Sequence, residues 1–561
     1  MRRYLPHFLT IACLGTVLPG CTPEQYARQA DRAAYGALTE GQRVALGRKH
    51  DFTVDYRPLP MEGQAGGGAI LLNGKEIPMG DADPVVVNLS DCLKVAFRNS
   101  RGFQTRKESL FSSALALANS RRAWNGSEYG GSLDASASHT KVHDGAETNA
   151  GAAGGSATLT QRFFQGGVLL LGASLDLATD FVGGSDTTIG SLLEGSFTQP
   201  LLRGAWRGLA YEDQYRRERD FVFNVFAYER FTQTFAADIV TRYYAVLRQR
   251  DQLENERESI RRLEATVKET KVKVDGGQVS RIQLDQAEQN LINAQIRFQR
   301  NMQDYEDALD GFKLFLGLPV PASIAVDYPG DLEMLTKVGP RPIPFEEAEA
   351  VEVALSVRPD VLTQRASLRD AERDVEIAAD DFNPRLDVEV GLSVPSKEDR
   401  TFWELQAHRH TRSVGVTFNY PIDQTDNRDA YRNALIAHDR ARRDYEEFID
   451  NVRLDVRQSY RSLVQSKRSY ELQVENVKLA RRRLRLAVLE QQHGLASARD
   501  RLEAEDALRN AQNGLTAALV QYTTTRLEFL AQLGMIWVDD EGQVHERRDP
   551  FKFDRLGQRY D

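Results

Sequence analysis

The chain lacks the residues and patterns that mark several large classes of protein. Its 561 residues include three cysteines, Cys13, Cys21 and Cys92, and two of them lie within the first 21 positions. Disulfides therefore do not form its framework. Beyond the N-terminal region no stretch reaches 18 uninterrupted apolar residues, so we expect no helical membrane span. Charged residues make up 27% of the sequence, which argues against a polytopic helical membrane protein.

Features of nucleic-acid-binding proteins and of enzymes are also missing. The formal net charge is −9 and no long block of lysine and arginine occurs, so nucleic acid is not an expected partner. The sequence contains no Ser-His-Asp order, no paired-cysteine motif and no His-Glu-x-x-His pattern. We therefore expect no catalytic residues, no metal site and no cofactor.

The N-terminus has the pattern of an export signal. Two arginines near the start precede the short apolar run Phe8–Val17, and Leu18-Pro19-Gly20-Cys21 resembles a bacterial lipobox. We expect residues 1–20 to be a signal peptide and Cys21 to be acylated, which would anchor the chain to a membrane. The alternative is an ordinary export signal with an incidental cysteine.

The body of the chain is an internal duplication. A shift of 217 residues overlays a gap-free stretch in which Leu316-Gly317 falls on Leu533-Gly534. Further upstream the register differs, and there Val95-Ala96 resembles Val353-Ala354. Self-similarity of this kind predicts two structural repeats, each containing a helix, strands and a long helical hairpin.

The duplication predicts the order of the segments. The first repeat covers residues 85–317 and the second covers residues 346–537. A proline-rich equatorial linker, residues 318–345, joins them. Residues 21–84 are predicted to be the lipid anchor and an extended linker, because proline and glycine are frequent there. Residues 538–561 form a polar C-terminal tail.

An apolar repeat of seven residues predicts the long helices. It consists of Leu284, Leu291, Phe298, Tyr305 and Phe312 in the first repeat, and Ile449, Val456, Leu463, Tyr470, Val477 and Leu484 in the second. Four or more such heptads are typical of coiled-coil packing. The proline-free stretches around them would form helices roughly 100 Å long. A coiled-coil rod without a pore has the same heptads, so this pattern alone does not exclude such a rod.

Alternating apolar and polar residues predict strands between the helices. These segments are Gly130–Thr140, Ser156–Phe163, Val168–Ala178 and Leu192–Gln199 in the first repeat, and Leu386–Val394 and Ser413–Tyr420 in the second. One face is apolar and the other small or polar, as a lipid-facing barrel strand needs. A rod has no use for such strands, so they favour a channel.

Two helical hairpins, two sets of strands and a duplicated Gly-x-x-Ser turn together resemble the TolC family of outer-membrane factors. Thr198–Gly204 resembles the family's passage from a strand into a long helix, and Leu316–Pro319 resembles the end of its first half. The resemblance covers roughly residues 85–537. It implies an α+β membrane protein and a homotrimer, whose outer-membrane β-barrel takes four strands from each protomer and is continued by a long α-helical coiled-coil barrel.

The resemblance also implies a function and a location. Members of the family are exit ducts of tripartite efflux or type I secretion systems, and receive small molecules or proteins from an inner-membrane pump and a periplasmic adaptor (membrane fusion) protein. We expect this chain to be lipid-anchored in the outer membrane, with a long periplasmic extension. Since four strands complete the family's barrel, we expect Ser156–Phe163 and Val168–Ala178 to form a hairpin outside the barrel wall. The alternative function is a structural coiled-coil periplasmic lipoprotein without a transport pore.

The tips of the two helical hairpins are the first candidate site. Gly277 and Gly494 permit the positive φ that reverses the chain, and Ser280 and Ser497 stand where they can cap the next helix. One interpretation is a structural turn and nothing more. The resemblance adds docking, because family members meet the hairpins of adaptor proteins at these tips.

The second candidate site follows the second tip. Asp500 and Glu503 are three residues apart and so share one helical face. Several family members carry acidic residues at these offsets, where three protomers would place six carboxylates around a narrow, cation-selective periplasmic entrance. The alternative is a solvated charged face with Arg499 and Arg501 as ion-pair partners.

Overall fold

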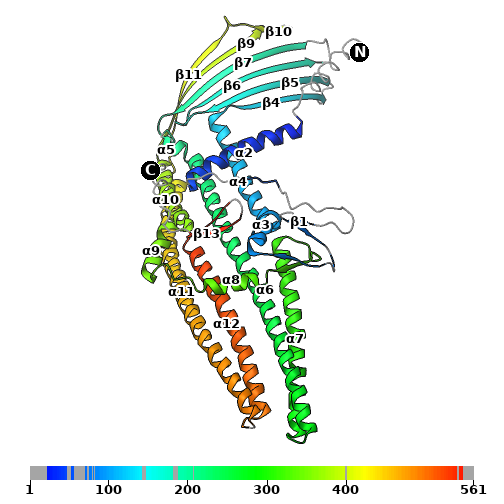
Figure 1. The fold of residues 1–561 in the computed structure, drawn as a ribbon. Helices are drawn as coiled ribbons and strands as arrows, with labels where there is room; N and C mark the ends of the chain where they lie inside the picture. The colour runs from blue at the N-terminus through cyan, green and yellow to red at the C-terminus, as the bar shows by residue number, and fades with distance from the viewer. Residues whose placement is uncertain are drawn as a thin grey trace, which may run out of the picture. The chain divides into compact units, whose positions relative to one another are not determined.

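The computed structural model describes most of the chain as two compact units (Figure 1). The described residues are 22–46, 52–55, 70–72, 75–78, 80, 83–141, 147–180, 187–205, 207–397, 401–493, 495–539 and 542–546. The predicted signal peptide, Cys21 and Gly494 lie outside them. In the described part of the chain, no helix combines the length and the apolar character that a membrane span needs.

The first unit comprises residues 1–49, 110–225 and 366–443, and contains one large antiparallel sheet. Its strands are β4 (Glu128–Lys141), β5 (Glu147–Arg162), β6 (Val168–Asp180), β7 (Thr187–Pro200), β9 (Arg385–Lys397), β10 (Thr401–Leu405) and β11 (Thr411–Asn419). The strand order is β4-β5-β6-β7-β9, and both β10 and β11 pair with β9. Every strand predicted from alternation is present.

The place of β5 and β6 corrects one expectation. They do not form a hairpin apart from the other strands, because β5 pairs with β4 along its length and β6 pairs with β7 (Figure 1). The separate hairpin was expected because four strands complete the family's barrel, and not because of the alternation in this chain. Both segments alternate in the same way as their neighbours, and in the middle of a sheet the backbone groups on both edges are paired.

The register gives the sheet two different faces. Residues directly opposite each other in an antiparallel pair lie on the same face, so the pairing carries each side chain's orientation from strand to strand. One face is apolar along the sheet, and includes Leu133, Leu159, Leu171, Leu193, Val390, Leu392, Val414, Val416 and Phe418. The other face has mostly small, hydroxyl-bearing and acidic residues, with Leu170 and Leu192 among them.

The helix α2 (Pro23–Leu46) belongs to the same unit and is longer than the linker interpretation allowed. Its buried residues recur every three or four positions and include Ala34, Leu38, Gly41 and Ala45. Gly41 has to be small, because a Cβ atom there would lie 2.3 Å from Cε1 of Phe221. The helical period in this segment therefore reflects real packing.

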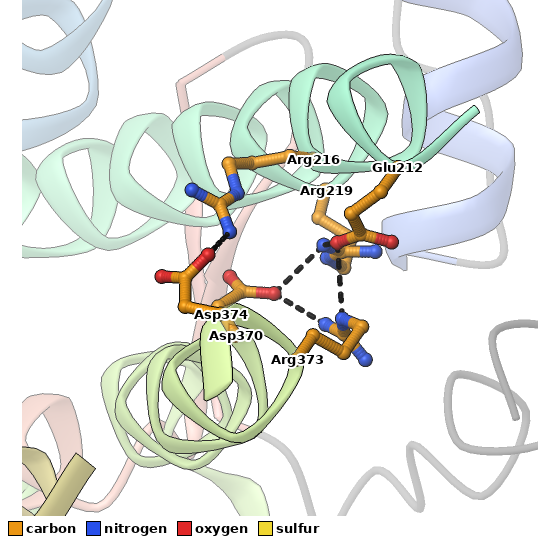
Figure 2. A network of polar contacts seen from close by, with 6 residues as sticks. All are labelled: Glu212, Arg216, Arg219, Asp370, Arg373 and Asp374. Atoms are coloured by element: carbon orange, nitrogen blue, oxygen red, sulfur yellow. Dashed lines mark hydrogen bonds and ion pairs between the residues drawn. The ribbon is translucent and has the colours of Figure 1, made fainter. Parts of the chain in front are cut away.

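A buried polar network fastens the start of α6 (Glu212–Asp275) to α10 (Pro359–Asp380) (Figure 2). Arg219 lies 2.5 Å from Glu212 and 2.7 Å from Asp370. Arg373 donates to Glu212 at 3.0 Å and also binds Asp370. Because Glu212 and Arg219 are almost fully buried, each charge depends on its partners. The network fixes the end of the long helix that lies in this unit.

The second unit comprises residues 50–109, 226–365 and 444–561. Its helices are α3 (Leu89–Asn99), most of α6, α7 (Arg281–Leu316), α8 (Gly330–Val338), α9 (Glu347–Val357), most of α11 (Thr425–Gln492) and α12 (Ala498–Gln532). α4 (Arg101–Asn125) and α10 run through both units, and α5 (Arg207–Ala210) lies in the first. With 64 and 68 residues, α6 and α11 are about 100 Å long, as predicted.

Short strands lie in the segments that the sequence assigned to linkers and tail, and at the borders of the two predicted repeats. They are β1 (Ile70–Leu72), β2 (Lys75–Ile77), β3 (Val85–Val87), β8 (Ile324–Val326), β12 (Ile536–Val538) and β13 (Val544–Glu546). β3 and β8 pair in parallel, and β12 and β13 form an antiparallel hairpin. The proline-rich segment 318–345 is thus structured, since it contains both β8 and α8.

Glycines end two helices at corresponding positions of the duplication. Gly317 follows α7 with φ +79°, and Gly534 follows α12 with φ +73°. A Cβ atom on Gly317 would lie 2.2 Å from the carbonyl oxygen of Asn99, and one on Gly534 would meet Val357 at 3.5 Å. Asn99 and Val357 are themselves the last residues of α3 and α9. Gly317 therefore leaves room for the end of α3, whereas at Gly534 a Cβ atom would make an ordinary contact with α9 and only the positive φ favours glycine.

We predict that Gly317→Ala destabilises the second unit by about 3 kcal/mol or more. The left-handed conformation costs alanine about 1–2 kcal/mol, and overlap with the Asn99 backbone adds to this. Gly277→Ala is the matched control, because Gly277 also has a positive φ, +68°, but a Cβ atom there meets nothing within 4 Å. Thermal unfolding of the detergent-solubilised protein measures both, and equal losses would contradict the assigned role of Asn99.

Candidate functional site at the hairpin tips

The first tip is a tight reversal between α6 and α7. Gly277 adopts φ +68°, as the sequence led us to expect. Its N–H donates to the carbonyl of Val274 at 2.9 Å, and the N–H of Gln278 donates to the carbonyl of Lys273 at 2.8 Å. These two bonds form a Schellman motif, which satisfies carbonyl groups at the end of α6.

The second tip ends α11 in a corresponding way. The N–H of Leu495 donates to the carbonyl of Glu490 at 2.8 Å. Under the shift of 217 residues, this bond coincides with the one from Gln278 to Lys273. The same backbone interaction therefore terminates both of the longest helices.

The two serines differ in their capping bonds. Ser497 and Asp500 form a capping box at the start of α12, in which the Ser497 hydroxyl oxygen accepts from the Asp500 N–H at 3.3 Å and the Asp500 carboxylate accepts from the Ser497 N–H at 2.9 Å. Ser280 has the same extended backbone at the N-cap of α7, but its side chain makes no capping hydrogen bond. The Gly-x-x-Ser spacing predicted both N-cap positions, but only Ser497 makes a side-chain capping bond.

The two candidate entrance carboxylates already have contacts within the chain. The pKa of Asp500 lies below its usual value, because its carboxylate accepts hydrogen bonds from Ser497. Glu503 lies 2.9 Å from Arg499 and 3.7 Å from Arg483, and all three side chains are largely exposed. Both carboxylates are solvent-accessible near the tip, where neighbouring charges partly compensate them.

Arg501 occupies a different place from the one expected. It was a candidate partner for the exposed acids, but it turns into the helix bundle. There it lies 3.0 Å from Glu505 and 2.9 Å from Glu269, and donates to Gln491 at 3.2 Å. This arginine therefore joins α6, α11 and α12 just above the tips. The sequence spacing shows the pair with Glu505 but not the one with Glu269, which is 232 residues away.

Two further polar contacts connect α6 to α12 farther from the tips. Glu256 is almost completely buried, and accepts from Arg509 at 2.9 Å and from Arg297 of α7 at 3.1 Å. Asp251 accepts from Thr516 at 2.7 Å, and burial raises its pKa. Polar groups of this kind specify how the hairpins align, because a shifted alignment would leave buried charges unpaired.

We predict that Arg501→Ala loosens the tips. The change leaves the buried Glu505 without its arginine partner, at a cost of about 3 kcal/mol. Hydrogen exchange should become faster in residues 264–275 and 488–506. Arg499→Ala is the control, and should cost at most about 1 kcal/mol because its pair is exposed. Unchanged exchange in Arg501→Ala would show that the contacts do not hold the helices together.

The same contact should respond to acid. Hydrogen bonding from Lys273, together with that from Arg501, holds the pKa of Glu269 below its usual 4.5. A carboxylate with a lowered pKa stabilises the fold above its unfolded-state value and loses that contribution as pH falls through the folded-state value. Lowering the pH from 6 to below 4.5 should therefore reduce the protection factors of these residues, which correct for the slower intrinsic exchange in acid, in the original chain and less so in Arg501→Ala.

Comparison with known proteins agrees with this geometry. Residues 350–535 match the family model described as Outer membrane efflux protein. Among solved structures, the chain resembles the open state of the MtrE outer membrane channel of Neisseria gonorrhoeae, at 15% identity and TM-score 0.59, covering 89% of this chain and 99% of that one. No curated protein sequence matches the chain.

Two other solved channels have the same fold. CmeC of Campylobacter jejuni is 15% identical with TM-score 0.57, covering 84% of this chain and 89% of that one. CusC is 14% identical with TM-score 0.58, covering 86% of this chain and 98% of that one. At these identities the likeness shows the fold.

The resemblance to the TolC family of outer-membrane factors is thereby confirmed. The chain has the mixed helical and sheet fold of solved outer-membrane channels, and residues 350–535 match the outer membrane efflux protein family. That family consists of transport channels rather than enzymes.

Proposed function

We propose that the chain is one protomer of a homotrimeric exit duct in the outer membrane. The duct would pass solutes outward from an inner-membrane pump and a periplasmic adaptor protein. The observation that carries this proposal is the combination, in one chain of the efflux-channel fold, of a sheet with one apolar face and helices about 100 Å long. The sheet suits a membrane and the helices suit a periplasmic tunnel.

The exposure of the apolar face supports a membrane location for the sheet. Leu133 is 80% exposed and Val414 is 75% exposed, and Val416 and Phe418 are also largely exposed. A continuous apolar surface of this kind is costly in water and is typical of a membrane or protein interface. The sheet would therefore form part of the β-barrel wall, with this face toward lipid.

A second apolar stripe on α11 supports assembly with further copies. Val456, Leu463 and Val477 of its predicted heptad are buried within the chain. Leu472, Leu479 and Leu486 also recur every seven residues but are more than half exposed. Two residues turn a helix by about 200°, so this second stripe lies on the opposite side of α11. In a closed coiled-coil barrel each helix packs against two neighbours, and a neighbouring protomer would cover it.

The tips are the proposed docking surface for the adaptor. Gly277, Ser280 and Ser497 lie in the two turns, Gly494 corresponds to Gly277 in the sequence, and large apolar side chains are exposed beside the described turn residues. These are Val272, Ile282 and Leu495. Exposed apolar groups on a rigid turn suit contact with another helical hairpin. Asp500 and Glu503 would line the periplasmic entrance, and three copies would favour cations there.

We predict that the protein forms trimers that conduct ions in planar bilayers, and that trivalent cations added on the side of the tips block the current. Asp500→Asn with Glu503→Gln should weaken this block at least tenfold. The side-chain oxygen of Asn at position 500 can still accept a hydrogen bond from the Ser497 N–H, while the negative charge is removed. The control is Asp444→Asn with Glu447→Gln, an exposed pair with the same spacing on α11.

Two outcomes would contradict these statements separately. Equal block in all three proteins would show that Asp500 and Glu503 only solvate a helix. A monomer that never conducts would overturn the duct and favour the alternative, a structural coiled-coil lipoprotein without a pore.

We further propose that acylation of Cys21 anchors the chain to the outer membrane. Cys21→Ser should abolish incorporation of a radiolabelled fatty acid while part of the protein still assembles, since the strands insert without the lipid. Cys13→Ser is the matched control and should keep full labelling, because Cys13 lies within the predicted signal peptide. Full labelling of Cys21→Ser would refute acylation at this residue.

A further inference from the structure

The sheet contains more strands long enough for a barrel wall than the four per chain that the family pattern implies. Six strands, β4, β5, β6, β7, β9 and β11, are each 9 to 16 residues long. A strand tilted in a membrane needs about 9–11 residues to cross the hydrocarbon layer. Each of the six therefore meets the length requirement, including the two that were expected to lie outside the wall.

The faces of β5 and β6 also match those of a wall. Leu159 of β5 lies opposite Leu171 of β6, which in turn lies opposite Gly195 of β7, and all belong to the apolar face. Ser156 and Ser174 also lie directly opposite each other, and this pair is on the polar face. A hairpin standing in water outside the barrel would have no reason to continue the apolar face of its neighbours.

The two outer strands have edges that fit each other. Within the described residues, β4 pairs only with β5, and β11 pairs only with β9, so each has one unpaired edge. Every step along β4-β5-β6-β7-β9-β11 is antiparallel, and these six strands are an even number. The β11 edge of one copy is therefore antiparallel to the β4 edge of the next, and repeated pairing can close a ring.

We propose that three copies close a wall of 18 strands, six from each chain, in place of a 12-stranded barrel. This inference rests on the proposed trimeric duct. Barrel diameter grows roughly in proportion to strand number, so the exit would be roughly 1.5 times as wide as with four strands per chain, and in barrels of 16–18 strands the interior is an aqueous channel. Such an exit would admit hydrophilic solutes of larger cross-section than a 12-stranded exit does.

The polar face supports an open and acidic interior. It carries Asp134, Asp176, Glu194 and Glu389. Small residues stand beside them: a Cβ atom on Gly154 would lie 3.1 Å from the carboxylate of Asp134, and one on Gly172 would lie 3.0 Å from Glu194. Because these neighbours are glycines, the carboxylates can lie along the wall. Such a lining favours neutral or cationic solutes over anionic ones.

Electron cryomicroscopy of the full chain in lipid nanodiscs counts the strands directly. We expect a trimer with 18 strands in its barrel cross-section. A trimer with 12 strands and three separate hairpins would overturn this inference and leave the proposed duct intact. A protein without a trimeric barrel would overturn the duct itself.

Cysteine labelling tests the same point in intact membranes. Ser174→Cys and Ala173→Cys are neighbours on β6 that face the polar and the apolar side. In an 18-stranded wall, a membrane-impermeant maleimide added outside should label Ser174→Cys at least tenfold faster than Ala173→Cys. Similar rates would place the hairpin in water and refute the proposal.

A deletion provides the matched narrow exit. Removing residues 147–180 takes out β5 and β6, and the remaining residues 142–146 and 181–186 connect β4 to β7, which are antiparallel to each other. Neutral polymers of graded size, added on the outer side, should enter the full-length barrel up to a radius roughly 1.5 times that for the deletion variant. Equal limits in two assembled trimers would refute the wider wall.

Discussion

Backbone pairing without a break from β4 to β11 is the constraint on which the first unit depends. Because side chains alternate with a period of two, a slip of one residue in any pair would turn a whole strand over. Leucines would then face the carboxylates of the neighbouring strand, and Glu194 would lie opposite Leu392 or Val394 on the apolar face. Register thus decides at once where the sheet is apolar, where it is polar, and which residues have to be small.

The second unit obeys a comparable rule with different chemistry. Its long helices have enough apolar contacts to associate, but heptads permit a helix to shift by a whole repeat. The buried contacts of Glu256, Asp251 and Arg501 are not interchangeable, so they select one alignment. The helical part uses charge to set its register, whereas the sheet uses the pattern of its two faces.

Sequence periodicity predicted most of the helices and strands. It did not predict contacts between residues that are far apart in the chain. Heptads and the lack of proline gave α6 and α11 nearly their full lengths, and alternation located all six long strands. Neither pattern states which strands are neighbours, so the family alone suggested a separate hairpin, whereas β5 and β6 pair with β4 and β7. The contact of Arg501 with Glu269 was invisible for the same reason, and Ser280 shows that a capping position does not guarantee a capping bond.

The unpaired edges of β4 and β11 have a consequence for a chain that has not yet assembled with other copies. An unpaired strand edge beside a broad apolar surface is a template for wrong pairing with any other extended chain. Newly made protomers would therefore aggregate if they accumulated in water, and the more so because this sheet is wide. In the proposed duct, each new chain would therefore need its strand edges covered by neighbouring copies soon after synthesis.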